Sequence, residues 1–445
     1  MTSHQVQFLF LDLGLIVLLA RGLGALAGRI GQPPVVGEIL AGVLMGPTLF
    51  GTAFTDRLVP ADVRPLLGAL ADIGVAVFMF VVGLEVEHRF LRGRVRATLG
   101  AAVGSTLVPF ALGIPLAFFL LRHHPTQQHT AFVVFVGLSV SVTAFPVLAR
   151  ILVSRGMSRL AIGGLALATA AVVDVFAWTA LAGVQAAVGG ADDYWQVSLL
   201  IPFTLLLLAV RPLVRRVLTH DGSGSVTPTG MAVVMVGTFL SAVATEMMGL
   251  HYIFGAFLFG ALMPREGTRA PREEIYERTG EITSLLLPVY FVVAGLKVDL
   301  RGLGLEGLTE LAAVLLVAVV GKFGGTYLGA RSQGLPAESS GTLAALMNTR
   351  GLTELVVLGV GLELGLLDGP LYSMMVVMAL VTTAMTGPVL NLIRARSSRR
   401  GLAVVPGPEA AGAGPAGSDA DAEGPGTRAA GEDADAPGRG TRAAG

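Results

Sequence analysis

Cysteine is absent from the 445-residue chain, which excludes disulfides, thiolate metal sites and thiol catalysis. Charged residues make up only 14% of the chain, whereas a soluble domain carries about 25%, and the formal net charge is zero. The HExxH, GxSxG and P-loop patterns are missing, and GLGLEG at 302–307 lacks the preceding strand that a dinucleotide fingerprint requires. These absences give no support for an enzyme, a bound cofactor or a nucleic-acid partner.

Apolar sequence, by contrast, is abundant: apolar residues make up 53% of the chain, and the mean hydropathy is +0.72. Runs of about 20 apolar residues recur, and each is long enough to cross a bilayer. The first run has no small-residue cleavage site and is followed by many others, so we interpret it as a span and not as a signal peptide. Thirteen helices are expected, at 6–29, 33–50, 65–88, 95–122, 129–153, 158–187, 195–217, 228–248, 251–264, 281–299, 305–330, 338–366 and 370–394.

The arginines support this helix count. With the N-terminus outside, the cytoplasmic segments hold 20 arginines and the outer segments hold four, as the positive-inside rule expects. A wrong helix count would scramble that alternation. The sequence therefore predicts an all-α polytopic protein that spans the bacterial plasma membrane, with its N-terminus outside and its C-terminus inside.

The last 45 residues differ in composition from the rest. Residues 1–400 form the predicted membrane domain, whereas residues 401–445 are rich in Ala, Gly, Pro and Asp and contain GTRAAG twice. Such a segment buries no core, so a disordered cytoplasmic tail is predicted and no soluble regulatory domain is expected.

Three pairs of similar segments recur in the same order and predict an inverted repeat over 33–187 and 251–394. They are AGVLMGP (41–47) with FGALMP (259–264), FVVGLEVEHR (80–89) with FVVAGLKVDLR (291–301), and SVSVTAFPVLARIL (139–152) with MNTRGLTELVV (347–357). Each pair joins an even-numbered helix to an odd-numbered one, so the repeats have opposite orientation. The last pair predicts two broken helices that cross at a binding site, as in many secondary transporters. Chance similarity between apolar helices is the alternative.

Asp174 is an acid in the middle of an apolar helix, in ALATAAVVDVFAW, with no basic residue within a turn or two. Charged groups at bilayer depth are expensive and usually functional. Desolvation disfavours the charged carboxylate, so this group is expected to hold either a proton or a cation, but not both at once. A hydrogen-bonded structural Asp is the alternative.

Lysine is nearly absent, because only Lys297 and Lys322 stand against 29 arginines. A lysine kept near the middle of the helix over 305–330 suggests a position where arginine cannot serve, because the compact amine can lose its proton when buried. We interpret Lys322 as a charge partner or a proton-carrying group near the site. Lys297, near a helix end, is expected to extend its amine toward water.

The two predicted helix breaks supply polar groups. Pro146 removes a backbone donor and frees an upstream carbonyl, and oxygen atoms of this kind suit a hard cation. Ser141 and Thr143 are the predicted cation ligands, with Ser139 beside them. The second break contributes Asn348, Thr349, Arg350 and Glu354.

Several of these charged residues have simpler interpretations. Arg350 and Glu354 are spaced i,i+4, so a structural ion pair is the favoured role for them. Glu38 and Asp72 are left open as supporting acids. His251 is expected to be an ordinary interfacial histidine, with pH sensing as the alternative.

At these segments the sequence resembles the monovalent cation:proton antiporter-2 family, the Kef- and NapA-like branch of sodium/proton exchangers. The likeness covers about residues 6–395. It is carried by GQPPVVGEILAGVLMGP (31–47), FVVGLEVE (80–87), SVTAFPVLARIL (141–152), HYIFGAFLFGALMP (251–264), PVYFVVAGLKVDL (288–300), GK (321–322), MNTRGLTELVVL (347–358) and ALVTTAMTGPVL (379–390).

The resemblance implies a homodimer whose mobile core half moves in elevator fashion against a scaffold half. In this family the ion-binding carboxylate ends an Asp-Asp or Asn-Asp pair, which corresponds here to Val173 and Asp174. Val173 binds no cation and carries no proton, so electroneutral one-for-one exchange is favoured. The nucleotide-binding domain of Kef-type proteins is missing from the sequence, so gating by nucleotides is not expected.

The first functional hypothesis is therefore exchange of Na+ or K+ for protons, with Asp174 as the shared carboxyl. The second is a proton-coupled symporter or exporter of an organic solute on the same fold. A non-transporting membrane sensor is a third, and the expected lack of a soluble output domain speaks against it. Proton flux that responds to alkali cations would favour the first hypothesis, and an organic flux insensitive to them the second.

Overall fold

The computed structural model describes residues 2–85, 95–157, 160–189, 198–219, 225–264 and 268–399, and within these ranges every regular element is a helix. The predicted tail over 401–445 lies outside the described residues. Nine helices are long and apolar enough to cross a membrane, or ten if one bent pair counts as a single span, in the part that the structure describes.

All thirteen predicted segments coincide with a helix or with an interrupted pair of helices. The number of membrane crossings remains a prediction, because two short apolar helices and the arginine-bearing helix over Leu200–Thr219 are not among the nine. Two boundaries were wrong: the helix predicted over 281–299 begins at Arg269, and the helix predicted over 370–394 continues to Arg399. The charged residues before 281 therefore form the first turns of a long helix, although their composition is typical of an interface segment.

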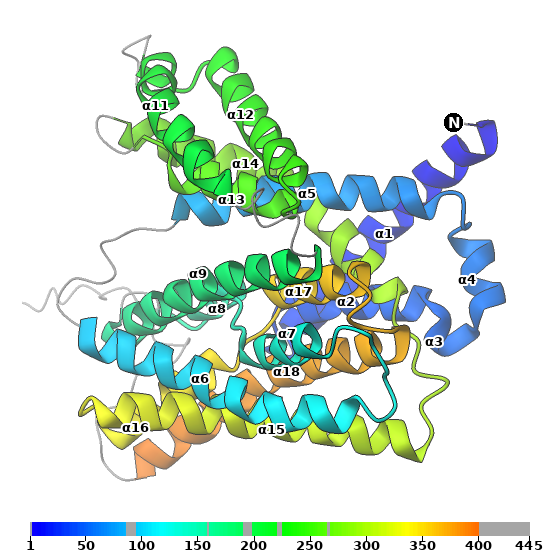
Figure 1. The fold of residues 1–445 in the computed structure, drawn as a ribbon, viewed down its shortest axis with the longest axis vertical. Helices are drawn as coiled ribbons and strands as arrows, with labels where there is room; N and C mark the ends of the chain where they lie inside the picture. The colour runs from blue at the N-terminus through cyan, green and yellow to red at the C-terminus, as the bar shows by residue number, and fades with distance from the viewer. Residues whose placement is uncertain are drawn as a thin grey trace, which may run out of the picture.

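The helices form two groups, which we call the scaffold half and the core half (Figure 1). The scaffold half consists of α1 (Ser3–Arg29), α2 (Pro34–Met45), α3 (Pro47–Phe50), α4 (Thr52–Leu58), α5 (Arg64–Glu85), α11 (Leu200–Thr219), α12 (Pro228–Met247), α13 (Tyr252–Ala261) and α14 (Arg269–Leu296). The core half consists of α6 (Val95–Leu120), α7 (His129–Ser141), α8 (Phe145–Ser154), α9 (Ala161–Gly189), α15 (Leu305–Ser332), α16 (Ala337–Met347), α17 (Leu352–Glu363) and α18 (Gly369–Arg399). Contacts are extensive within each half and sparse between them, where α14 touches α17 and α2 touches α18.

Glycines bring backbones into direct contact inside each half. A Cβ atom at Gly104 would lie 2.2 Å from the carbonyl oxygen of Gly325 on α15, and one at Gly42 would lie 2.2 Å from that of Val292 on α14. Among the described glycines, every backbone approach of this kind under 3.0 Å joins elements of the same half. Each half is thus closely packed, and the surface between the halves lacks such interlocking.

The segments predicted to face outside gather at one end of the bundle, which we call the outer face. His4 lies 3.7 Å from Asp62, and Thr48 donates a 2.7 Å hydrogen bond to the carbonyl of Val298. At the opposite end, the inner face, Arg155 donates a 2.6 Å hydrogen bond to Asn391. Each of these contacts joins residues that the arginine distribution places on the same side, and the orientation of the chain in the membrane stays a prediction.

Candidate functional site

Two interrupted helices meet in the middle of the core half. The first break separates α7 from α8, with Val142 and Ala144 extended and Pro146 in the first turn of α8, where its missing N–H costs nothing. The second separates α16 from α17, which are bent by 45°. The N–H of Ala144 donates to the carbonyl of Thr349 at 3.0 Å, so the two breaks satisfy each other's backbone groups.

The Arg350 side chain binds the free carbonyl groups at the C-terminal end of α7. Its guanidinium donates to the carbonyl oxygens of Ser139 and Val140 at 2.6 and 2.5 Å and to the Glu354 carboxylate at 2.6 Å. A helix C-terminus carries partial negative charge, so a cation is favoured there. Both members of the predicted Arg350–Glu354 pair are fully buried, and the structure confirms that pair.

Lys322, on α15, occupies the remaining end of the same helix. Its amine donates to the carbonyls of Ser141 and, at 3.0 Å, of Ser105 on α6. Three consecutive carbonyls of α7 therefore already accept bonds from basic side chains. Lys322 forms no ion pair with Asp174 within 4.0 Å in the described structure, although the two charges act on each other.

The side chains predicted as cation ligands are likewise engaged. The Ser141 hydroxyl donates to the carbonyl of Leu138 at 2.8 Å, and the Thr143 hydroxyl donates to that of Met347 at 2.9 Å. Thr349 shares a 3.4 Å hydrogen bond with Thr386, and the Asn348 amide donates to the carbonyl of Thr382 at 3.1 Å. The Ser141 and Thr143 hydroxyls act as donors in these bonds, so their oxygens keep lone pairs, and their role as ligands of a transported ion stays a prediction.

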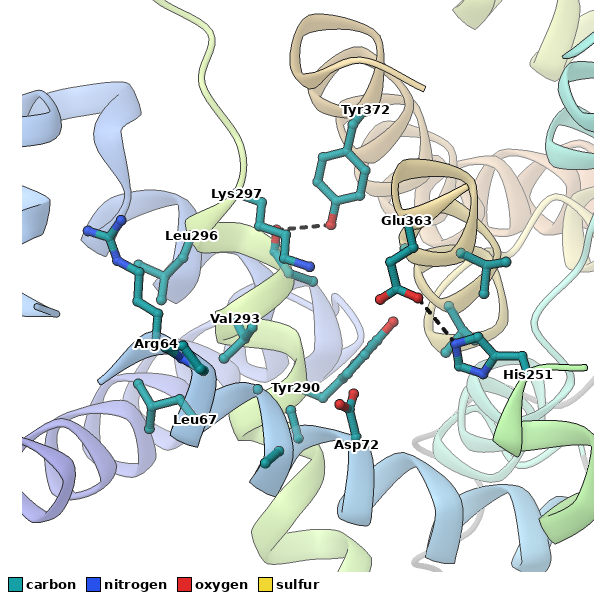
Figure 2. Close-up of a pocket in the computed structure, with 18 of the residues that line it drawn as sticks. Arg64, Leu67, Asp72, His251, Tyr290, Val293, Leu296, Lys297, Glu363 and Tyr372 are labelled. Atoms are coloured by element: carbon teal, nitrogen blue, oxygen red, sulfur yellow. Dashed lines mark hydrogen bonds and ion pairs between the residues drawn. The ribbon is translucent and has the colours of Figure 1, made fainter. Parts of the chain in front are cut away.

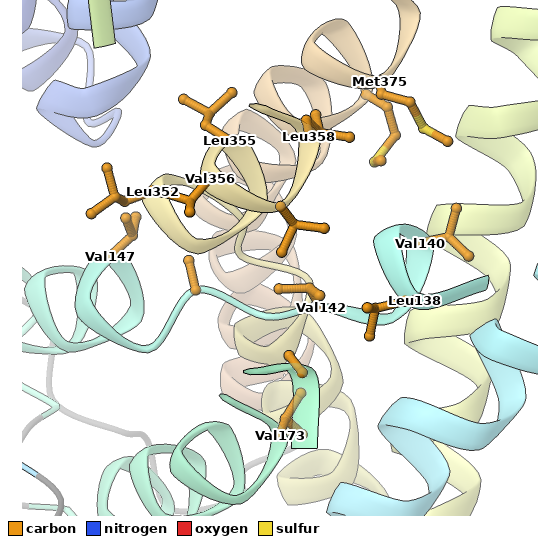
Figure 3. Packing of buried hydrophobic residues seen from close by; sticks show 14 of the residues in the cluster. Leu138, Val140, Val142, Val147, Val173, Leu352, Leu355, Val356, Leu358 and Met375 are labelled. Carbon is orange, nitrogen blue, oxygen red and sulfur yellow. The ribbon is translucent and has the colours of Figure 1, made fainter. Parts of the chain in front are cut away.

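Asp174, on α9, differs from the Glu354 carboxylate, one oxygen of which accepts from Arg350, although Asn348 Oδ1 and Ser139 Oγ also lack a partner in the described structure. It is 3% exposed, and neither of its carboxylate oxygens has a hydrogen-bond partner among the described residues. The N–H of Phe145, at the start of α8, acts on the carboxylate without reaching it in hydrogen-bond geometry. The side chain of its neighbour Val173 packs in an apolar cluster that also contains Val142 and Val140 (Figure 3). The site thus holds one unsatisfied carboxyl beside the positive end of a short helix.

A cavity of about 620 Å³, the outer vestibule, lies between the two halves at the outer face. Asp72 on α5 accepts a 3.0 Å hydrogen bond from the Tyr252 hydroxyl, and Glu363 on α17 lies 3.6 Å from His251. Figure 2 shows the ring of Tyr290 between these two acids, with Lys297 beside them. Asp72, whose role the sequence left open, therefore lines the cavity between the halves.

A second cavity of about 590 Å³, the inner vestibule, lies between the halves nearer the inner face. It is lined by Glu38 from α2, Glu85 from α5 and Arg150 from α8. Glu85 accepts a 2.6 Å hydrogen bond from the Tyr276 hydroxyl. Glu38 is thus a vestibule residue, and Pro146 and Leu352, next to the two breaks, line the same cavity.

The two vestibules come close to each other at α17. Leu352 lines the inner vestibule, whereas Val356, one helical turn further along, lines the outer one. Leu352, Val356 and Val147 belong to one apolar cluster between them (Figure 3). Asp174 is not among the side chains that line either vestibule, so an ion reaches it only if the packing changes.

Sequence reasoning missed several polar groups. Asp12 on α1 is fully buried with both oxygens unpartnered, and its place inside the first apolar run was a usable signal. No local sequence pattern marked Glu363 and Tyr290, because their place in the outer vestibule depends on residues that are distant in the sequence. His251 is a vestibule residue that contacts both halves and is not a simple interfacial histidine.

Comparison with known proteins identifies the family. Residues 14–394 match the family model described as the transmembrane sodium/hydrogen exchanger. The Na+/H+ antiporter NhaS4 of Synechocystis is 36% identical over 403 residues, which cover 88% of this chain and 98% of that protein. The K+/H+ antiporter 1 of Saccharomyces cerevisiae is 34% identical over 391 residues, or 83% of this chain and 44% of that one.

Cation/H+ antiporter 20 of Arabidopsis thaliana is 36% identical over 424 residues, or 90% of this chain and 50% of its own length. This chain thus spans about half the length of the plant and yeast relatives. The solved structure of the sodium proton antiporter MjNhaP1 from Methanocaldococcus jannaschii shares the fold, with a TM-score of 0.58 at 14% identity over 88% of this chain and 97% of that one. These relatives are named as antiporters and not as enzymes. The chain therefore belongs to the transmembrane sodium/hydrogen exchanger family of cation/proton antiporters.

Proposed function

We propose that the chain exchanges Na+ or K+ for protons across the membrane, with Asp174 as the carboxyl that both ligands share. The observation that carries this proposal is a buried carboxyl with no protein partner on either oxygen, among described neighbours whose carbonyls and hydroxyls are mostly engaged.

An empty, ionised carboxylate in this position is costly. Removing an ion from water costs several kcal/mol even after the protein relaxes, and no direct hydrogen bond from the described residues offsets that cost at Asp174, on which Lys322 and the N–H of Phe145 act only from a distance. A proton or a bound cation removes it, and one carboxyl accommodates only one of them at a time. Exchange follows because the site returns across the membrane only when it is occupied.

Movement of the core half against the scaffold half would expose Asp174 to each vestibule in turn. Sparse contacts between the halves and close glycine packing within them support this elevator motion. The predicted inverted repeat supports it as well, because α2, α5 and α8 correspond to α13, α14 and α17. Elements from both sets line the vestibules.

The charge balance favours one-for-one, electroneutral exchange. Val173 is 1% exposed in an apolar cluster, so it offers no second carrier of charge. Lys322 donates to two carbonyls and forms no ion pair with Asp174 within 4.0 Å in the described structure, so the carboxyl is the group that is left to carry the exchanged charge. One carboxyl then carries one cation in one direction and one proton in the other.

The test is a cation-selectivity series on the purified protein in liposomes, with a pH-sensitive dye inside. Adding Na+ or K+ outside should move protons, and Asp174→Asn should abolish the signal while leaving the amount of folded protein unchanged. Asp56→Asn, which removes an exposed acid paired with Arg64 on the outer face, is the matched control and should exchange normally. A D174N protein that exchanges at the wild-type rate would sink the proposal.

A proton-coupled symporter or exporter of an organic solute is the second candidate. The observation in its favour is the size of the outer vestibule, because about 620 Å³ lined by three tyrosines exceeds what a bare cation needs. Proton-dependent organic flux that ignores alkali cations would favour this candidate. A homodimer in the bacterial plasma membrane remains a prediction for either candidate.

A further inference from the structure

Trp178 is a second unpartnered polar residue on α9, one helical turn after Asp174. It is 3% exposed, as Asp174 is, and its indole N–H has no hydrogen-bond partner among the described residues. A buried donor without an acceptor costs free energy, and so does a buried acceptor without a donor. These two complementary groups, so close along one helix, therefore invite a common explanation.

The side chains of Asp174 and Trp178 project from the same face of α9. Residues spaced i,i+4 are neighbours on a helix surface, and a helical side chain leans toward the N-terminus, so the indole of Trp178 lies over the turn that carries Asp174. Val175 and Phe176, which lie between them in the sequence, are 45% and 41% exposed and point away from this face. The indole N–H and the carboxylate thus share one protected surface.

Phe254 packs against the indole from the scaffold half. This residue belongs to α13, and its ring meets that of Trp178 edge to face, with centroids 6.2 Å apart and an interplanar angle of 89°. Further along α9, Gln185 accepts a 3.2 Å hydrogen bond from the N–H of His251, the residue before α13. The Trp178 ring therefore lies where the core half meets the scaffold half, next to the proposed ion-binding carboxyl.

The other groups that act on Asp174 leave its oxygens free. Lys322 from α15 and the N–H of Phe145 from α8 act on the carboxylate without a direct hydrogen bond, and Lys322 donates to two backbone carbonyls instead. Glu85 from α5, which lines the inner vestibule, is a like charge that acts on it as well. Within the described structure, the indole N–H is therefore a buried donor that no other acceptor occupies.

We propose that Trp178 is a positioning residue of the exchange site, whose indole N–H donates a hydrogen bond to one oxygen of the ionised Asp174 carboxylate and leaves the other oxygen to the cation. This inference rests on the proposed function, because the cation has to bind Asp174. The two groups do not bond in the position seen here, so one side chain has to rotate. A neutral indole donor suits this place, since it stabilises a carboxylate without adding a charge that would repel the cation.

The hydrogen bond should favour the cation in its competition with the proton. Hydrogen bonds to a charged acceptor are stronger than those to a neutral one, so a protonated Asp174 gains less from the indole than an ionised one. Loss of the N–H should therefore weaken cation binding. The rate of exchange at saturating cation should change little, because the carboxyl itself remains.

Trp178→Phe tests the N–H alone, because it keeps an aromatic ring against Phe254. In liposomes, the cation concentration for half-maximal exchange should rise roughly ten- to a hundred-fold, while the rate at saturating cation changes less than about two-fold. The control is Phe254→Leu, which removes the aromatic contact and leaves the N–H in place, and it should keep the wild-type half-saturating concentration. Thermal unfolding checks that both variants fold. A W178F protein with wild-type half-saturation, or an F254L protein with the same increase as W178F, would overturn the inference.

Fluorescence reports on the hydrogen bond directly. The chain has one other tryptophan, Trp195, which lies outside the described residues, so Trp195→Phe leaves Trp178 as the single emitter. Indole emission moves to longer wavelength when the N–H donates to a charged acceptor. Adding Na+ or K+ should therefore shift the emission of W195F, with half of the shift at the concentration that half-saturates exchange, and W195F/D174N should show no shift. If W195F exchanges cations and its emission ignores them, the hydrogen bond does not form and the inference is wrong.

Failure of the exchange function and failure of the hydrogen bond are distinguishable. If the wild type exchanges cations, wild-type behaviour of W178F overturns the role of Trp178 alone. If the wild type exchanges no alkali cation, the proposed function fails, and the emission of W195F in alkaline buffer still decides the hydrogen bond. An ionised Asp174 should then give emission at longer wavelength than W195F/D174N gives, and identical spectra would overturn the bond as well.

Discussion

The outer and inner vestibules are built alike but differ in the charge that the core half supplies. On the scaffold side, each has a carboxylate of α5 bound by a tyrosine hydroxyl, Asp72 by Tyr252 outside and Glu85 by Tyr276 inside. The core half adds an acid, Glu363, to the outer vestibule and a base, Arg150, to the inner one. The outer vestibule also contains a titratable imidazole.

This difference concerns the basic groups, because an imidazole lines the outer vestibule and arginines line the inner one. An arginine keeps its charge at all physiological pH values, whereas a histidine does not. The guanidinium groups of the inner vestibule should therefore keep their charge when the pH changes. The outer vestibule should present a field that changes with the pH of the medium it faces.

The largest expected effect is a loss of stability at the helix break between α16 and α17, which contains Arg350. Arg350→Ala leaves Glu354 buried and unpaired and frees two carbonyls of α7, so we expect a loss of about 3–5 kcal/mol of unfolding free energy. The control is Arg278→Ala, which breaks a partly exposed i,i+4 pair with Glu274 and should cost about 0–1 kcal/mol. Thermal unfolding in detergent measures both, and similar losses would contradict the assignment of Arg350 as the residue that holds the break.

The prediction of intermediate size concerns His124 at the outer face, whose charge should make the thermal stability of the protein depend on pH. Burial of the His124 ring favours its neutral form, but hydrogen bonds to Asp368 and Glu310 and the charges of these two carboxylates outweigh it, so the pKa of His124 is raised. A raised pKa stabilises the fold fully below the unfolded value of about 6.5, and this stabilisation is lost as pH rises through the folded value. The wild type should therefore lose thermal stability on the alkaline side of neutrality.

His124→Gln should remove that slope and cost about 1.5–3 kcal/mol at acid pH, where the charged hydrogen bonds exist. His129→Gln, which replaces an exposed histidine on the same face, is the control. If the unfolding temperatures of H124Q and wild type differ by the same amount at pH 6 and pH 9, His124 is not the titrating group.

The smallest effect separates the vestibules themselves. Asp72→Asn should weaken the apparent affinity for a cation added from the outer side, and Glu85→Gln should do so from the inner side. Each change should be about three- to ten-fold, since a unit charge at about 4 Å is worth about 1 kcal/mol in water. Right-side-out and everted vesicles measure the two sides separately, and two variants that both act on one side would break the comparison.

Much of the fold was predictable because its signals are local. Apolar runs and alternating arginines give the helices, and Pro146 and the glycine after Arg350 mark the two breaks. The Arg350–Glu354 pair was predictable for the same reason, since i,i+4 spacing on a helix decides it. The start of α14 was missed because charged residues in a long helix resemble an interface segment.

The candidate site was only partly predictable. Asp174 stood out because a lone acid in an apolar helix is costly wherever the helix lies. The contacts of Lys322 with Ser105 and Ser141 join residues 217 and 181 positions apart, so no local pattern reveals them. The same holds for His251 and Glu363, whose contact depends on how two separate helix groups come together.

The glycine contacts have a consequence for where this molecule tolerates change. At Gly104 or Gly42 even one added methyl group would force two backbones apart, so each half has little freedom to adjust by small steps. The interface between the halves has no such backbone interlocking among the described glycines, and it contains both vestibules. Substitutions that change the rate of exchange should therefore be tolerated at the interface between the halves, whereas the closely packed interior of each half should tolerate few changes.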